Sequence, residues 1–198
     1  MRTKTRDMAQ TMPMPPAAGR ACCLFDTAFG VCGIAWSPDG LIRVQLPERD
    51  AGLTEKRLRA KAGSRVEQNL PRAIADCVTR LQRYFAGAPV DFRDAPLDFT
   101  GVSAFNADVY RALRGIGWRQ TTTYGALARR VGNPQAAQAV GVAMATNPWP
   151  IIVPCHRVLA AAGKLGGFTA PGGAATKLKL LRMEGAEIDQ GLPLFGDF

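Results

Sequence analysis

Residues 121–146 contain the pattern that most restricts the fold of this chain: two short helical segments separated by a tight turn. A threonine-rich run ending at Tyr124 leads into a predicted helix over residues 125–131, and Gly132-Asn133-Pro134 supplies the turn. Asparagine is a good N-cap and proline suits the first helical position, so a second helix is predicted over residues 134–146, with Asn133 as its N-cap. Two helices joined in this way form a helix-turn-helix unit.

The second of these helices is unusually thin. Alanine and glycine occupy positions 136, 137, 139, 141, 143 and 145, and only Val140 and Met144 are larger apolar residues on its expected inner face. Such a helix can approach another surface closely. Two interpretations fit equally well: tight packing inside the protein, or insertion into a narrow groove of DNA, where the helix would contribute shape and its surroundings the charge.

The run from Pro150 to Val158 carries the candidate chemistry. Two prolines enclose an apolar Ile-Ile-Val segment, which is followed by Cys155 and by His156, the only histidine among 198 residues. A buried cysteine is usually an inert apolar residue, but a stiff extended segment that presents a thiol beside His156 and Arg157 favours a thiolate. Neighbouring residues of an extended strand face opposite ways. The sequence therefore leaves open whether His156 reaches Cys155 directly, through a turn or through a water.

A last helix is predicted from Ala174 to about Glu184, which is the first carboxylate after a long stretch without acidic residues. A carboxylate at a helix C-terminus opposes the helix dipole. We therefore expect Glu184 to have a partner, and His156 is the candidate.

The N-terminal half has a different pattern. Short β-rich runs at residues 22–25, 31–36 and 41–46 alternate with turn residues, which predicts an antiparallel meander. Two helices follow, over residues 51–62 and after Pro71, and the second is expected to cover one face of the sheet. The domains predicted are a disordered leader at 1–20, an α+β domain at 21–97, a helical domain at 98–186 and a tail at 187–198, with a linker at 87–101.

Basic residues are unevenly distributed. The chain has a net charge of +9, and residues 109–183 contain ten Lys and Arg but no Asp or Glu. The excess therefore lies on the block that contains Cys155, as expected if that surface meets a phosphate backbone. Chance clustering is the plainer alternative.

The five cysteines, at positions 22, 23, 32, 77 and 155, are odd in number and have no repeating spacing. This argues against a disulfide framework and favours a reducing compartment, so a cytoplasmic protein is expected. No run of apolar residues approaches the length needed to span a membrane, and the first twenty residues lack the apolar core of a secretory signal.

Pro154-Cys155-His156-Arg157-Val158, preceded by Asn147-Pro148 and by Asn133-Pro134 with the small-residue helix between them, closely resembles the O6-alkylguanine-DNA alkyltransferases, or methylated-DNA-protein-cysteine methyltransferases. The resemblance covers about residues 103–185. It implies an α+β fold, with an N-terminal ribonuclease-H-like domain followed by a C-terminal winged-helix domain that carries the helix-turn-helix. It also implies repair of double-stranded DNA containing O6-alkylguanine, in which the damaged base is flipped into a pocket.

The same resemblance implies roles for individual residues. Cys155 would accept the alkyl group, and His156 (through a water) and Glu184 would take the proton of its thiol. Asn147 would brace the turn that holds these groups. Tyr124 would contact the flipped base and the 3′ phosphate. Substrate contacts are implied for Val158, Thr169 and Phe168, and an apolar entrance is expected at Trp149 and Pro150. DNA contacts are expected at Gln138, Ala137, Thr123, Arg157 and Lys164.

Two positions depart from the family's pattern. Gln138 stands where the family normally has an arginine that fills the space left by the extruded base, so weaker binding or slower flipping is expected. Phe168 stands where tyrosine is frequent, which keeps an apolar wall and removes a hydroxyl. The zinc ligands of some members have no counterpart. We expect no metal and no cofactor, and we expect the protein to be a monomer.

Two other functions fit parts of the pattern. A non-catalytic, alkyltransferase-like protein would bind the lesion and recruit another pathway, but such proteins usually lack the cysteine present here as Cys155. A helix-turn-helix regulator could use Cys155 as a sensor, but the thin helix lacks side chains that read bases.

Overall fold

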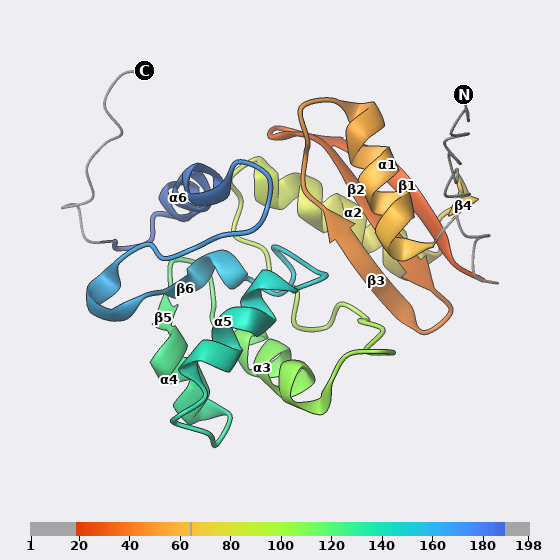
Figure 1. Cartoon of the computed structure of the whole chain (residues 1–198). Coiled ribbons are helices and arrows are strands. Elements are labelled where there is room, and N and C mark those ends of the chain that lie inside the picture. The colour runs from red at the N-terminus through yellow and green to blue at the C-terminus, as the bar shows by residue number, and fades with distance from the viewer. Residues whose placement is uncertain (1–18, 64, 189–198) are drawn as a thin grey trace, which may run out of the picture.

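The computed structural model describes residues 19–63 and 65–188, so the predicted leader, apart from its last two residues, and nearly all of the tail lie outside the described residues. An α+β half containing a four-stranded sheet is followed by a mainly helical half (Figure 1). Strands β1 (Ala21–Thr27), β2 (Gly30–Ser37) and β3 (Gly40–Gln45) form the predicted antiparallel meander. The sequence did not predict β4 (Arg65–Val66), which pairs parallel to β1 and completes the order β3-β2-β1-β4.

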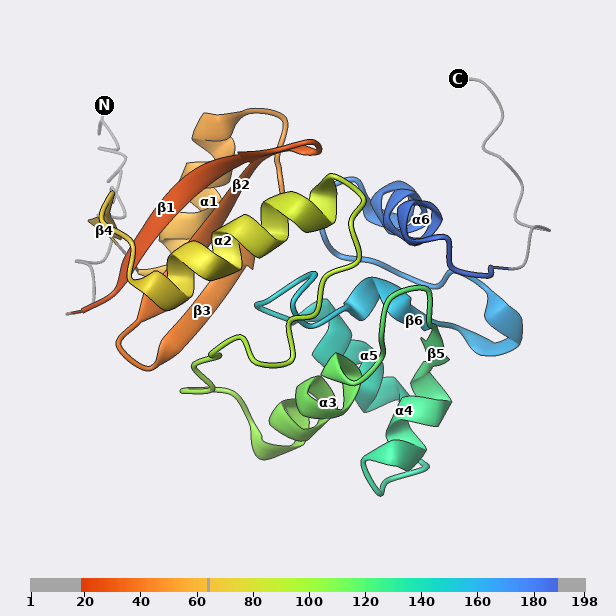
Figure 2. The ribbon, with the colours of Figure 1, turned by 180° about the vertical axis from the view of Figure 1, so that it is seen from behind.

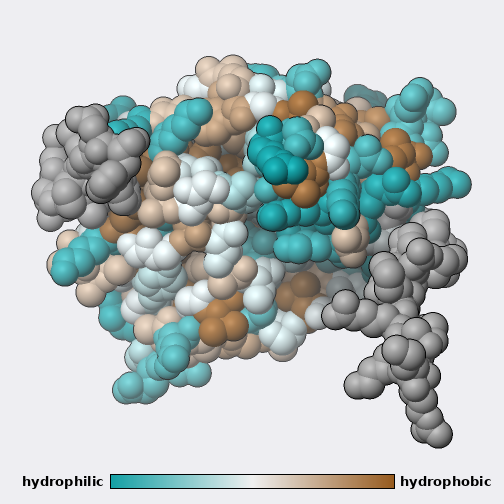
Figure 3. Space-filling model, turned by 45° about the horizontal axis from the view of Figure 1, so that its top comes forward, coloured by the Kyte–Doolittle hydropathy of each residue, from teal (hydrophilic) through white to brown (hydrophobic). Residues whose placement is uncertain are grey.

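Helices α1 (Ala51–Ala62) and α2 (Arg72–Phe85) cover opposite faces of this sheet, as the front and back views show (Figures 1 and 2). The division follows the alternation of side chains along β2. Ile34 and Trp36 belong to the core on the α2 side, whereas Ala35 packs with Leu58 of α1. A Cβ atom at Gly33 would lie 2.6 Å from a Leu58 methyl carbon, so this glycine lets α1 approach closely. Hydrophilic surface gathers where α1 faces solvent (Figure 3).

The predicted linker at 87–101 contains no helix but is held on both sides. Leu41 of β3 donates its N–H to Pro96 O at 2.8 Å and accepts from the N–H of Asp98 at 2.9 Å. Arg114 Nη2 donates to the carbonyl groups of Phe92, Arg93 and Ala95 at 2.6–2.8 Å. The linker therefore joins the two halves through ordered hydrogen bonds.

The C-terminal half contains α3 (Ala104–Arg114), α4 (Tyr124–Arg130), α5 (Ala137–Ala145) and α6 (Gly173–Glu184). Between α5 and α6 lie two 3₁₀ turns, η1 (Cys155–Arg157) and η2 (Ala161–Gly163), and strand β6 (Val158–Leu159), which pairs parallel to β5 (Thr122–Thr123). Ser103 caps α3, as expected, by accepting a hydrogen bond from the N–H of Asn106.

The start of the thin helix was predicted wrongly. Residues 134–136 form a turn, and α5 begins at Ala137 with Ala136 in the N-cap position. The reason is that the Asn133 carbonyl accepts from the N–H of Ala136, three residues on, which closes a turn rather than a helical repeat. Asn133 therefore does not cap the helix, although the helix-turn-helix order of α4 and α5 holds.

One hydrophobic core runs through both halves. Trp149 is fully buried, stacks edge-on with Phe99 and Tyr110, and donates from Nε1 to Leu41 O of the sheet at 2.7 Å. Val44 of β3 donates its N–H to Pro148 O at 2.9 Å. The turn before Cys155 is thus fixed to the N-terminal sheet. Within residues 19–63 and 65–188, no helix has the length and apolar character needed to cross a membrane.

Candidate active site

Cys155 lies on a turn rather than at the end of an extended segment, which corrects the sequence prediction. Ile151 has a left-handed φ of 75°, and the chain folds back so that Val153 N–H donates to Trp149 O at 2.8 Å. Cys155 then begins the 3₁₀ turn η1 and is 7% exposed. Because the backbone is not extended here, the alternation of side chains between two faces does not apply to Cys155 and His156.

Behind Cys155 lies a buried polar network centred on Glu184 at the end of α6. His156 Nε2 is 2.8 Å from Glu184 Oε1, and the Tyr84 hydroxyl donates to the same oxygen at 2.7 Å. Arg157 donates to both carboxylate oxygens at 2.8 Å and to Ile116 O at 2.6 Å. His156 and Glu184 are in contact, as the position of Glu184 at the helix end predicted.

This network fixes which nitrogen of His156 carries the proton. Burial alone would raise the pKa of Glu184, but hydrogen bonds from His156 and Arg157 outweigh it and lower that pKa to about 2. Burial also lowers the pKa of His156, against the opposing effect of Glu184. An ionised carboxylate only accepts hydrogen bonds, so Nε2 of a neutral His156 is the protonated nitrogen. His156 Nδ1, which is buried and has no hydrogen-bond partner among the described residues, then has a free lone pair.

The thiol of Cys155 is held in its protonated form. Burial raises its pKa, while the Asn147 side chain and the positive charge of Lys177 act in the opposite direction. Lys177 is fully buried on α6, donates to Val158 O at 2.6 Å, and has a pKa lowered by burial to about 8. Cys155 therefore needs a base before it can act as a nucleophile.

Asn147 connects the two ends of the turn that precedes Cys155. Its Nδ2 donates to Val153 O at 2.8 Å, and its Oδ1 accepts from the N–H of Trp149 at 2.9 Å. Both hydrogen bonds use the same amide group, so the side chain holds the turn in one conformation.

Cys155 lines a cavity of about 140 Å³ between the two halves of the chain. Pro150, Phe168 and Thr169 also line it, so three of the predicted substrate contacts lie together with the thiol. Trp149 does not: it is a core residue, because its indole is fully buried and its N–H is bound to the sheet. Val158, another predicted substrate contact, is not among the residues that line the cavity, and its carbonyl oxygen accepts from Lys177.

The predicted DNA contacts divide into two groups. Gln138 on α5 and Lys164 after η2 are exposed, and Ala137 and Thr123 are partly exposed, Thr123 as the N-cap of α4. Arg157 is instead 6% exposed, and its guanidinium is bound to Glu184 and a backbone carbonyl. Its side chain does not present the surface charge that the prediction required.

Tyr124 begins α4 and is half-buried. A Cβ atom at Gly166, whose φ is 67°, would lie 3.4 Å from the Tyr124 ring and 3.5 Å from its hydroxyl oxygen. These are ordinary contact distances, so it is the left-handed φ, and not lack of space, that favours glycine where this loop passes beside the ring.

Sequence reasoning missed two buried polar residues near the site, Tyr84 and Lys177. Tyr84 lies in the last turn of a helix with ordinary core spacing, and nothing in that pattern distinguishes its hydroxyl from one in a simple core tyrosine. Lys177 did have a signal. Lys177, Leu180, Leu181 and Glu184 follow the spacing of one helical face, so a charged residue at each end of an apolar stripe indicated buried, partnered charges.

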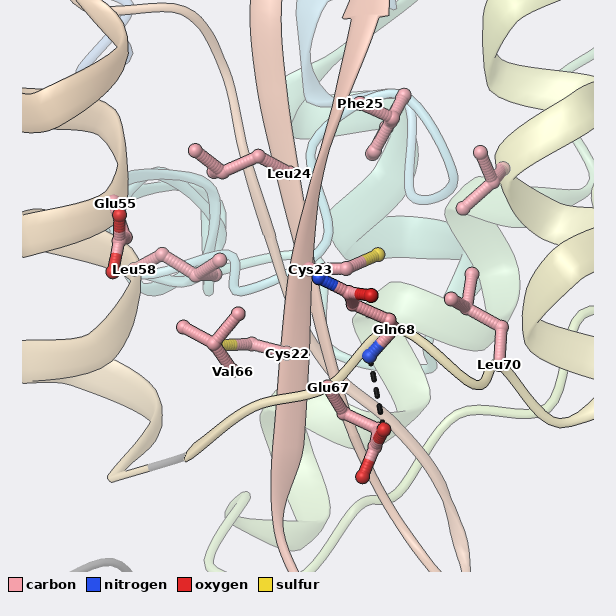
Figure 4. A pocket seen from close by; sticks show the side chains of 11 residues that line it. Cys22, Cys23, Leu24, Phe25, Glu55, Leu58, Val66, Glu67, Gln68 and Leu70 are labelled. Carbon is pink, nitrogen blue, oxygen red and sulfur yellow. Dashed lines mark hydrogen bonds between the residues drawn. The ribbon is translucent and has the colours of Figure 1, made fainter.

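A larger hollow of about 440 Å³ lies on the N-terminal sheet, away from Cys155 (Figure 4). Its lining is mostly apolar and includes Leu24, Leu70 and the thiol of Cys23. Burial, with a smaller effect of Cys22, raises the pKa of Cys23 to about 11, and this lining contains no histidine. This hollow is larger than the cavity at Cys155, but a thiol without a base is a poor nucleophile.

Among residues 19–63 and 65–188, no group of three or more His, Cys, Asp or Glu side chains is placed to hold a metal ion. Cys23, Cys32, Cys77 and Cys155 are free thiols.

Each half of the chain matches a domain model of the same known family. Residues 21–99 match the model described as 6-O-methylguanine DNA methyltransferase, ribonuclease-like domain, and residues 104–186 match the DNA binding domain of the same family. These matches confirm the expected α+β order of a ribonuclease-like domain followed by a DNA-binding domain.

Two sequence relatives show the range of similar proteins. A methylated-DNA–protein-cysteine methyltransferase of Mycolicibacterium paratuberculosis is 46% identical over 125 residues, which are 63% of this chain and 73% of the relative. A DNA base-flipping protein of Thermus thermophilus is 45% identical over 106 residues, 54% of this chain and 69% of the relative.

Among solved structures, that of Mycobacterium tuberculosis OGT in complex with DNA is similar, with a TM-score of 0.67 and 34% identity over 83% of this chain and 92% of that one. Since the two domain models together span most of the sequence, and relatives by sequence and by structure carry the same name or bind DNA, the chain belongs to the 6-O-methylguanine DNA methyltransferase family.

Proposed function

We propose that this chain repairs double-stranded DNA by moving an alkyl group, with methyl as the simplest case, from O6 of guanine to Sγ of Cys155. The observation that supports this most directly is the position of Cys155, which lines a cavity while the adjacent His156 is held as a neutral base by Glu184. A soft sulfur nucleophile suits attack on an alkyl carbon, and a neighbouring base can take the proton that the buried thiol carries.

In the first step, His156 Nδ1 takes the thiol proton through a water, since Nδ1 makes no direct hydrogen bond to a described residue. The imidazolium that results is stabilised by the ionised Glu184, which is itself held by Arg157 and Tyr84. Sγ then attacks the alkyl carbon, the C–O6 bond breaks, and the electron pair stays on guanine. Guanine then accepts a proton in place of the alkyl group. The family resemblance implies that Tyr124 contacts the flipped base.

The product is a thioether at Cys155, which ordinary hydrolysis does not reverse. Each molecule therefore acts once, and the transfer needs neither a metal nor an organic cofactor. Phe168 and Pro150 provide apolar walls for the base and its substituent, while Asn147 keeps the turn in place.

On the DNA side, α5 is the helix that approaches the minor groove, and the damaged nucleotide is flipped toward Cys155. Exposed Gln138 takes the place of the extruded base, and Thr123, Ala137 and Lys164 contact the backbone. Gln138 is uncharged and shorter than an arginine, so binding is weaker or extrusion slower than an arginine would give. The protein acts as a monomer on its DNA.

The test uses a duplex oligonucleotide with labelled O6-methylguanine. One equivalent of label is expected on the peptide containing Cys155, found by mass spectrometry, with unmodified guanine left in the DNA. Cys155→Ser should abolish transfer and keep DNA binding, whereas Cys23→Ser, the matched control in the larger hollow, should transfer normally. Tight lesion binding without transfer by the unaltered protein would instead identify a non-catalytic lesion-binding protein.

A further inference from the structure

The cavity that contains Cys155 is also lined by a cation from the other half of the chain. Arg43 belongs to β3, and its side chain lines the same 140 Å³ space. Its Nε is buried and has no hydrogen-bond partner among the described residues. Burial lowers the pKa of Arg43, which is the effect expected of a cation withdrawn from water without a counter-ion.

The one acidic residue in the lining of this cavity is already engaged. Glu48 Oε1 accepts from Arg57 at 2.8 Å and from Gln45 Nε2 at 3.1 Å. Lys61 adds another positive charge, and it lies near enough to Arg43 for repulsion between them to be the main cause that lowers the pKa of Lys61. The N-terminal end of the cavity therefore carries unneutralised positive charge.

Arg43 is half-buried, and burying its Nε without an anion is costly. A guanidinium binds carboxylates well through its fork of N–H groups. The space it shares with Cys155 is where a substituent on O6 of the flipped guanine would project. Resting on the function proposed above, we infer that this cavity selects O6 substituents that bear a carboxylate, with carboxymethyl as the smallest, and that Arg43 binds the carboxylate while Cys155 attacks the attached carbon.

The reaction balances as for methyl: the bond from Sγ to the methylene carbon forms, the bond from that carbon to O6 breaks, and the electron pair stays on guanine. The thiol proton leaves through His156, guanine gains one proton, and Cys155 ends as S-carboxymethylcysteine.

The experiment compares two substrates of matched size in the same duplex, one with O6-carboxymethylguanine and one with its neutral amide, O6-carbamoylmethylguanine. Single-turnover rate constants are measured for each protein, and the readout is their ratio. A general loss of activity cancels in this ratio, so that only the response to charge remains. The variants are Arg43→Gln, Arg43→Lys and, as a matched control, Arg65→Gln on the exposed strand β4.

The unaltered protein should favour the carboxylate substrate. Arg43→Gln should reduce the ratio by about tenfold to a hundredfold, the range for losing a hydrogen bond to a charged group. Arg43→Lys should retain part of the preference, and Arg65→Gln all of it. An unchanged ratio in Arg43→Gln would overturn the inference.

Two further outcomes distinguish this inference from a role of Arg43 in binding DNA and from failure of the proposed function. If Arg43→Gln weakens binding to undamaged duplex and slows both substrates equally, the guanidinium serves a DNA phosphate, and the inference is wrong. If the unaltered protein transfers nothing even from O6-methylguanine, the proposed function itself fails, whatever the behaviour of Arg43.

Discussion

The hydroxyl group of Tyr84 donates a 2.7 Å hydrogen bond to the carboxylate of Glu184, which is 100 residues further along the chain. Tyr84 is in the last turn of α2, in the ribonuclease-like half, and Glu184 ends α6 in the DNA-binding half. The same hydroxyl lies 3.2 Å from His156 Nε2. The N-terminal half is therefore part of the proton-accepting network and does more than support the DNA-binding half.

Replacing Tyr84 with phenylalanine should destabilise the protein by about 1.5–3 kcal/mol, because the lost hydrogen bond has a charged acceptor. Tyr110→Phe is the matched control, since the Tyr110 hydroxyl donates at 2.8 Å to a neutral acceptor, Ala143 O. Its cost should be about 0.5–1.5 kcal/mol. Urea denaturation followed by tryptophan fluorescence measures both, and equal losses would contradict a special role for Tyr84.

Glu184→Gln should cost about 3–5 kcal/mol at pH 7, because it leaves the buried guanidinium of Arg157 without its anion. The cost should also depend on pH. The pKa of Glu184 is lowered to about 2, so its stabilising effect is complete above its ordinary pKa of 4.5 and is lost as the pH falls toward 2.

Unfolding free energies of the two proteins should therefore converge by about 3 kcal/mol between pH 5 and pH 2, at about 1.4 kcal/mol for each unit of pKa shift. Glu55→Gln is the control, since its ion pair with Arg59 is exposed and is worth less than about 1 kcal/mol. A gap between the wild-type and Glu184→Gln proteins that stays constant with pH would show that Glu184 is not ionised in the folded protein.

His156→Gln should slow methyl transfer by about a hundredfold or more, the usual contribution of a positioned base. Glutamine can still donate a hydrogen bond to Glu184 but cannot take the proton of Cys155. Rapid-quench single-turnover measurements give the rate, and circular dichroism checks that the fold is kept. The defect should shrink as the pH is raised, because hydroxide then removes the proton that His156 no longer accepts. A defect that is the same at every pH would contradict the assignment of His156 as the base.

Gln138→Arg should strengthen binding to DNA and raise the rate of transfer from duplex substrate, since an arginine reaches further and adds a charge near the phosphates. Gln135→Arg adds the same charge in the exposed turn before α5 and should change affinity without the gain in transfer rate. Fluorescence anisotropy and single-turnover rates separate the two effects. If Gln138→Arg changes neither, residue 138 does not fill the space left by the base.

The parts of the fold governed by local chemistry could be predicted from the sequence. The alternation of the first three strands and the Ser103 cap depend on residues that are neighbours in the chain, and both predictions are confirmed. The start of α5 could not be predicted, because the Asn133-Pro134 pair suits a turn as well as a cap. Strand β4 is two residues long and depends on pairing with a distant strand.

The site shows the same division. The contact between His156 and Glu184 followed from a carboxylate placed unfavourably at a helix end. The burial of Arg157 did not follow, because a basic residue beside a DNA-binding motif has the same sequence signature whether it faces DNA or a buried carboxylate. Only the packing of α6 against η1 decides between these two positions.

The hydrogen bond from Trp149 to Leu41 and the core that continues through both halves affect how the chain comes apart. Because its domains share one apolar interior, we expect heating to produce a single melting transition, with the calorimetric and van't Hoff enthalpies in agreement. Fragments cut at the boundary near residue 98 would expose that interior to water. We therefore expect the two domains to unfold together, although each matches a separate family model.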